Sequence, residues 1–159
     1  MNYLIWKLLH IAAVVIFLGN IITGLFWAAR AHKTRDFKLI ASTFQGITKS
    51  DRIFTLPGII LVTLAGIVAA IHGHWPILGT GWILWSIILF SILGVIFSVY
   101  VAPLQKKIAK FADTADSSDE NWKKYEKIYK QWELWGLLAT LTPVAAFVLM
   151  VIKPSLSGL

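Results

Sequence analysis

The chain contains no cysteine and few charged residues for its length. Without cysteine, no disulfide, thiolate metal ligand or cysteine nucleophile can form. Charged residues make up 14% of the 159 residues and hydrophobic ones 57%, whereas soluble domains carry roughly 25% charge. A Ser-His-Asp set, a phosphate-cradling glycine loop and a carboxylate pair suited to hydrolysis are also missing. These absences argue against a soluble hydrolytic enzyme and indicate a membrane protein.

Four stretches are long and apolar enough to cross a bilayer, which takes about 20 residues each. They cover about residues 3–29, 53–71, 82–102 and 132–152. We therefore predict an all-α fold, an integral membrane four-helix bundle that forms a single membrane domain over residues 1–159. A cleaved signal peptide is the alternative for the first stretch, but its apolar run exceeds the usual 7–15 residues. We expect it to be retained as a span.

The basic residues gather in two segments between the spans. Thirteen of the fifteen lysines and arginines fall within 30–52 and 103–131. Cytoplasmic loops carry such an excess of positive charge, so we expect these two loops in the cytoplasm and both termini on the outer side of a bacterial inner membrane. The basic residues flank spans and form no recognition motif, so the expected partner is the lipid bilayer and not nucleic acid.

Two helix starts are predicted inside these loops. Thr48 precedes the second span as an N-cap, and Ser117–Glu120 has the reach of a capping box. Asp51 and Arg52 are expected to pair with Arg30 or Glu133 and lock this end of the bundle. Pro57 is expected to kink the second helix, because its ring displaces a carbonyl one turn back.

Aromatic residues recur at helical spacing ahead of the fourth span: Trp122, Tyr125, Tyr129 and Trp132. An amphipathic helix with one basic and one aromatic face lies at a membrane interface. We therefore expect an aromatic belt at the inner surface, in preference to a surface for docking a partner.

The first span carries an ionisable residue, His10, on a face of small and polar residues. The members of this face follow in steps of three and four: His10, Ala13, Phe17, Asn20, Gly24 and Trp27. Small and polar side chains in lipid turn toward neighbouring helices, so we expect the face to point into the bundle. His10, Asn20 and Gly24 are thus the candidate cofactor-binding residues.

Three chemical roles remain open for His10: helix packing through a hydrogen bond, ligation of haem or a metal, and proton handling. At 1.5 Å per residue His10 lies about 10 Å below the start of its span, whereas His72 and His74 lie near the outer surface. Haem with His10 as its single protein ligand therefore needs less distortion than a site shared with His72. His72 and His74 remain a weaker candidate for copper or zinc.

Several motifs resemble a bacterial four-span family of integral membrane proteins of unknown function. The resemblance covers nearly the whole chain and rests on Trp6–Ile11, Gly19, Trp27 and Arg30, on Ser50–Gly58, and on Trp132 with Leu149–Pro154. It implies the four-span fold and no particular reaction.

A more distant resemblance is to membrane protoporphyrinogen oxidases and the membrane domain of copper-resistance D proteins. Those chains share an opening similar to Lys7-Leu-Leu-His10-Ile and a closing apolar run that ends in Lys-Pro. In the oxidases the histidine is associated with haem b, which the resemblance carries over to His10. Their Arg-Asn-Glu before the last span is replaced here by Gln131-Trp-Glu133, so the oxidation reaction is not carried over.

The first functional hypothesis is therefore a membrane protein that binds haem b through His10 and has a redox or haem-handling role. A cofactor-free accessory or assembly subunit, as a homo-oligomer or within a membrane complex, is the second. The third is copper or zinc handling on the outer face by His72 and His74, with His10 as a further potential metal ligand.

Overall fold

The computed structural model describes residues 3–158, which form four long helical rods and no strand within that range. Each rod contains a segment long and apolar enough to cross a membrane. The all-α prediction is confirmed, and so is the prediction of four helices that are long and apolar enough to span a membrane. Helix bounds along the chain are α1 Tyr3–Thr34, α2 Phe37–Ser50, α3 Leu56–His72, α4 Gly81–Ile96, α5 Ala102–Thr114 and α6 Asp119–Ile152.

The second and third rods each contain a π-helical turn in front of a proline. The turn η1, Asp51–Thr55, joins α2 to α3 and is followed by Pro57. The turn η2, Phe97–Val101, joins α4 to α5 and is followed by Pro103. Proline lacks an N–H and its ring clashes with a carbonyl one turn back, and a π turn absorbs that misfit within a continuous helix. The structure thus shows a widened turn in front of Pro57, while the kink itself stays a prediction.

The helices extend well beyond the predicted spans, so the segments 30–52 and 103–131 are mostly helical and not open loops. Only short turns remain, at residues 35–36 and 115–118. The Thr48 cap is wrong: α2 already begins at Phe37, where the Asp36 side chain accepts hydrogen bonds from the N–H groups of Lys38 and Leu39. Thr48 lies mid-helix and donates to the Phe44 carbonyl.

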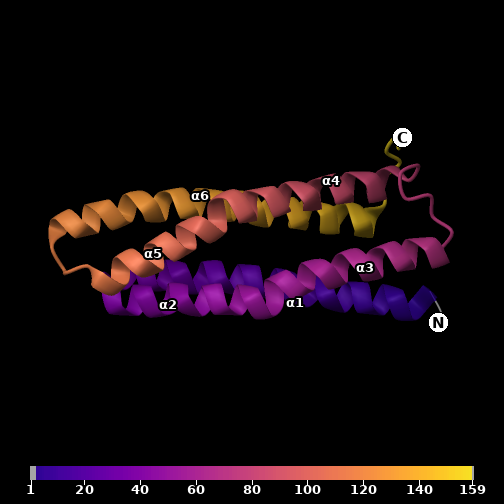
Figure 1. Cartoon of the computed structure of the whole chain (residues 1–159). Coiled ribbons are helices and arrows are strands. Elements are labelled where there is room, and N and C mark those ends of the chain that lie inside the picture. The colour runs from indigo at the N-terminus through magenta and orange to yellow at the C-terminus, as the bar shows by residue number, and fades with distance from the viewer. Residues whose placement is uncertain (1–2, 159) are drawn as a thin grey trace.

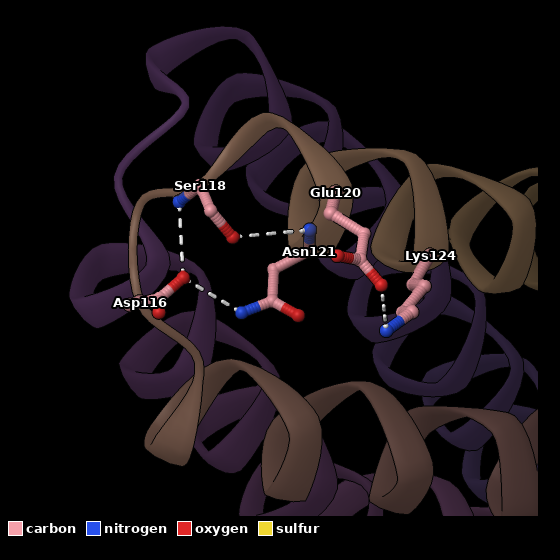
Figure 2. Close-up of polar contacts among 5 residues, drawn as sticks. All are labelled: Asp116, Ser118, Glu120, Asn121 and Lys124. Carbon is pink, nitrogen blue, oxygen red and sulfur yellow. Dashed lines mark hydrogen bonds and ion pairs between the residues drawn. The ribbon is translucent and has the colours of Figure 1, made fainter.

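The start of α6 lies one residue later than the capping box predicted. Ser118 is the N-cap, and its Oγ accepts from the Asn121 N–H at 3.4 Å (Figure 2). Asp116 accepts from the Ser118 N–H and from Asn121 Nδ2. Glu120 pairs with Lys124 at 2.7 Å and does not reach back to the cap. The predicted start of α6 is therefore correct to within one residue. The hydrogen bonds that cap it come from Asp116 and Ser118, and not from Ser117 and Glu120 as in the predicted capping box.

Both termini and the 73–80 connection lie at one end of the molecule, here called the termini end (Figure 1). The turns 35–36 and 115–118 lie at the opposite end, here called the basic end. At the basic end α2 packs against α5, and α1 and α6 complete a compact bundle. Toward the termini end the chain divides into two pairs, α1 with α3 and α4 with α6. No Cα of α3 comes within 8 Å of α4 or α6 in the described chain.

The hydrophobic core is concentrated at the basic end and holds the aromatic residues of α6. Tyr125, Tyr129 and Trp132 are at most 3% exposed. They pack against Phe37 and Phe44 of α2. The prediction of an aromatic belt is therefore wrong for these three side chains. Burying such rings against other helices removes 150–250 Å² each from solvent, which explains why the helices hold together outside the predicted spans.

Candidate functional site

The His10 ring lies between α1 and α3 with one nitrogen already in use. Its Nδ1 is 2.8 Å from the carbonyl oxygen of Val62. A carbonyl only accepts, so Nδ1 donates the proton, and in the neutral imidazole the lone pair sits on Nε2. Gly66 lies beside the ring: a Cβ there would come within 2.9 Å of Nδ1. The sequence at Val62–Gly66 thus fixes both the orientation and the tautomer of His10.

The predicted face of α1 does not form one site. Ala13 and Phe17 are buried, with Phe17 against Gly58 and the Phe90 ring. Trp27 is 53% exposed and stacks with Arg30 instead of pointing inward. Asn20 lies ten residues from His10, about 15 Å along the helix. Asn20 and Gly24 therefore line a second place in the fold, separate from His10.

His72 and His74 lie at the end of α3 and in the connection that follows it. His72 is exposed at the end of α3, and its Nδ1 is 3.0 Å from the Val68 carbonyl oxygen. His74 is exposed in a left-handed turn with φ 56°. Within residues 3–158 no group of three or more His, Cys, Asp or Glu side chains lies close enough together to hold a metal ion. The copper or zinc hypothesis thus gains nothing from this geometry.

A buried polar cluster surrounds Asp51 in the turn η1. Asp51 Oδ1 accepts from Asn20 Nδ2 at 3.1 Å and from Thr55 Oγ1 at 2.7 Å. Asp51 Oδ2 accepts from Gln105 Nε2 at 3.1 Å. Ser50 donates from its hydroxyl to Asn20 Oδ1. The expected ion pair is wrong for Asp51, because its partners are neutral. Arg52 is exposed and takes part in neither of the ion pairs recorded within residues 3–158. We refer to Asn20, Ser50, Asp51, Thr55 and Gln105 as the Asp51 cluster.

Two cavities adjoin the Asp51 cluster. A small one of about 30 Å³ is lined by Asp51, Gln105 and Trp132, among mostly apolar side chains. A larger groove of about 390 Å³ lies between α1 and α2. Its polar lining is Asn20, Thr23, Thr43 and Ser50. Asn20, Gly24 and Ile47 line both spaces, so the groove adjoins the small cavity that Asp51 lines.

An aromatic cage encloses His32 at the basic end. The imidazole stacks on Tyr129 at 4.0 Å and on Trp122 at 5.4 Å, and its Nδ1 shares a 3.2 Å hydrogen bond with the Tyr125 hydroxyl. Burial lowers the pKa of His32 and raises the pKa of both tyrosines. The cage therefore favours a neutral imidazole between protonated phenols.

Sequence reasoning missed the Asp51 cluster and this cage. Asp51 was noticed, but its partners come from helices far apart in the sequence. One feature of the sequence points to Gln105 as a possible member of the cluster: it is an amide next to an apolar span. Nothing in the sequence around His32 predicts the cage. The spacing of Trp122, Tyr125 and Tyr129 does predict that these three side chains share one face of α6.

Four apolar helical rods with a polar cluster between them define a multi-pass integral membrane protein. The family described as "Predicted integral membrane protein (DUF2269)" matches residues 4–154, and the chain belongs to it. Comparison with curated proteins finds no match. Comparison with solved structures finds none either.

Proposed function

We propose that this membrane protein binds haem b through Nε2 of His10 and has a haem-handling or redox role. The observation that carries the proposal is the contact of Nδ1 with the Val62 carbonyl at 2.8 Å. Histidines that ligate metals almost always donate their other N–H to a carbonyl or carboxylate, which holds the ring in place and makes it a better ligand. His10 has that arrangement within an apolar helix.

The surroundings of His10 fit a haem with one protein ligand. His72 and His74 lie at the termini end and His32 at the basic end, so none is at the level of His10. Within the described chain no Cα of α1 or α3 comes within 8 Å of α4, although the Phe17 and Phe90 rings touch. This wider helix spacing favours entry of a flat apolar ring beside α1 on the side of Phe17 toward the termini end. When bound, haem would supply one-electron chemistry. The protein's part is to orient Nε2 and to keep water away with its Leu, Ile and Val side chains.

An absorption spectrum of protein purified from haem-replete cells tests the proposal. We expect a Soret band in the wild type that is lost or shifted in His10→Ala. His72→Ala is the matched control and should keep the wild-type spectrum, since its ring lies exposed at the helix end. A folded, monodisperse preparation without Soret absorbance contradicts haem binding.

A cofactor-free accessory or assembly subunit is the competing function. It predicts a colourless protein that co-purifies with another membrane subunit, or with a second copy of itself, in mild detergent. A coloured protein that runs alone excludes this alternative.

A further inference from the structure

Asp51 is a buried carboxyl without a counter-ion. The residue is only 7% exposed to solvent. The ion pairs recorded within residues 3–158 are Lys124–Glu120 and Lys130–Glu126, and neither involves Asp51. Moving an isolated carboxylate out of water costs several kcal/mol unless it is paired or neutralised. Three neutral donors reduce this cost but bring no charge.

The charged groups on every helix packed around Asp51 point elsewhere. On its own rod Lys49 and Arg52 are exposed, and on α5 Lys106 and Lys107 are exposed. On α1 no charged residue lies between Lys7 and Arg30. Glu133 on α6 is half-buried and accepts from the Tyr129 hydroxyl. The Asp51 carboxyl therefore contacts only neutral hydrogen-bond donors and the occupant of the small cavity.

The small cavity has the chemistry of a water site. Trp132 lines it, and the indole Nε1–H is buried without a hydrogen-bond partner in the described chain. An occupant that serves both groups must accept a hydrogen bond from Trp132 and donate one to Asp51. Water does both, whereas a metal cation cannot accept. A volume of about 30 Å³ holds one water molecule.

The two carboxylate oxygens differ in how many donors they already have. Oδ1 accepts from Asn20 and from Thr55, whereas Oδ2 accepts from Gln105 alone. Oδ2 therefore keeps a free lone pair for a proton. The groove, with its hydroxyl and amide lining, provides a polar route from that region to the surface.

We propose that Asp51 is a reversible proton-binding site, served by a water in the small cavity and by exchange through the groove between α1 and α2. The cavity water gives a proton to Oδ2 and takes one from the next water in the groove. The carboxylate becomes a neutral carboxylic acid, and no group is oxidised or reduced. Asp51 lies in the turn that leads into the second span, and buried ionisable residues mark proton or ion traffic in many membrane proteins. This site is distinct from the His10 site and does not depend on haem.

Infrared spectroscopy across a pH series, with the protein in lipid nanodiscs, tests this proposal. We expect a protonated-carboxyl C=O band that appears as pH falls, shifts on exchange into D₂O and moves when the protein carries ¹³C-carboxyl aspartate. Asp51→Asn should abolish this band. Glu133→Gln is the matched control, because it removes a half-buried carboxyl from the neighbouring helix and should leave the band in place.

Trp132→Phe keeps the carboxyl and removes the unpartnered donor. It should shift the titration midpoint of the band, because the cavity water loses one of its two partners. If Asp51→Asn does not fold, the isotope shift in the wild type and the midpoint shift in Trp132→Phe still decide the question. An Asp51 that stays ionised, or one that stays protonated, over the whole pH range overturns the proposal. His10→Ala should leave the band unchanged, so this test and the Soret test fail independently.

Discussion

At the scale of single residues, the two histidines that touch other helices are held in different ways. His10 is fixed by a backbone carbonyl and by a glycine that leaves room for the ring. His32 is fixed by stacking on the rings of α6. The first arrangement leaves a nitrogen free for a ligand, and the second surrounds the imidazole with aromatic faces.

Gly66→Ala should destabilise the protein, although alanine is normally the better helix former by about 0.5–1 kcal/mol. The added methyl group meets His10 Nδ1, so the ring must move and lose its bond to Val62. Overpacking of this kind costs about 1–3 kcal/mol. Thermal unfolding in detergent measures it, and the Soret band should weaken in parallel.

Gly94→Ala is the control for this substitution, because nothing lies within 4 Å of a Cβ at that position. It should be neutral or slightly stabilising. If the two alanine variants unfold at the same temperature, the contact between Gly66 and His10 is not a structural constraint.

The pH dependence of stability should report on His32. Burial lowers its pKa in the folded state, with Lys130 and Arg35 acting in the same direction and Glu126 and Glu133 opposing. Below the ordinary histidine pKa of about 6.5, the unfolded chain then binds more protons than the folded one. The free energy of unfolding therefore decreases as the pH falls from about 6.5 to the lower pKa that His32 has in the folded state. Below that pKa the contribution of His32 is fully lost.

His32→Phe keeps a ring for stacking and cannot titrate. Its melting temperature should fall less than that of the wild type between pH 8 and pH 5. His74→Gln, at an exposed position, should follow the wild type. Parallel curves for His32→Phe and the wild type would show that the cage does not penalise the charged imidazole.

At the scale of helices, caps and π turns decide where each element begins and how it passes a proline. Asp36 accepts from two N–H groups at the start of α2, and η1 and η2 accommodate Pro57 and Pro103. The turn η1 also sets the Asp51 side chain toward Asn20 and Gln105. π turns occur frequently at functional sites, which agrees with the proton-binding role proposed for Asp51.

Asp36→Ala should cost about 1 kcal/mol, the usual loss for an N-cap aspartate. Both hydrogen bonds to the first turn of α2 disappear, and this end of the helix frays. Chemical denaturation or a shift in melting temperature measures the change. Asp113→Ala, an exposed position on α5 for which the structure records no hydrogen bond or ion pair, should change stability by less.

At the scale of the whole molecule, the compact basic end contrasts with the two separate helix pairs at the termini end (Figure 1). The aromatic core at the basic end holds the four rods together. The remaining apolar surface of the spans, such as Leu8, Val15 and Leu141, is more than 60% exposed and suits contact with lipid. Such surface costs free energy in water but not in hydrocarbon.

The topology prediction from the basic residues extends to the whole molecule. A phosphatase fused after residue 159 should be active, because the termini are expected on the outer side. A fluorescent protein inserted at residues 115–118 should fluoresce, because the basic end is expected in the cytoplasm. The opposite pair of signals would reverse the orientation, and with it the side from which the groove opens.

The sequence by itself determined the class of protein, the number of spans and the face on which His10 lies. These properties depend on local composition and on helical spacing, and both can be determined from residues that are close together in the sequence. It also came within one residue of the start of α6. It placed α2 wrongly, because the polar residues before the second span concealed a helix whose apolar face packs against α5.

Only the tertiary structure decided what those residues contact. Asp51 meets Asn20 and Gln105 from two other rods, and a contact between residues 54 positions apart leaves no periodic signal in the sequence. The aromatic residues of α6 show the same limit. Their spacing is visible in the sequence, but whether they face lipid or a protein core depends on how far the neighbouring helices extend beyond the predicted spans.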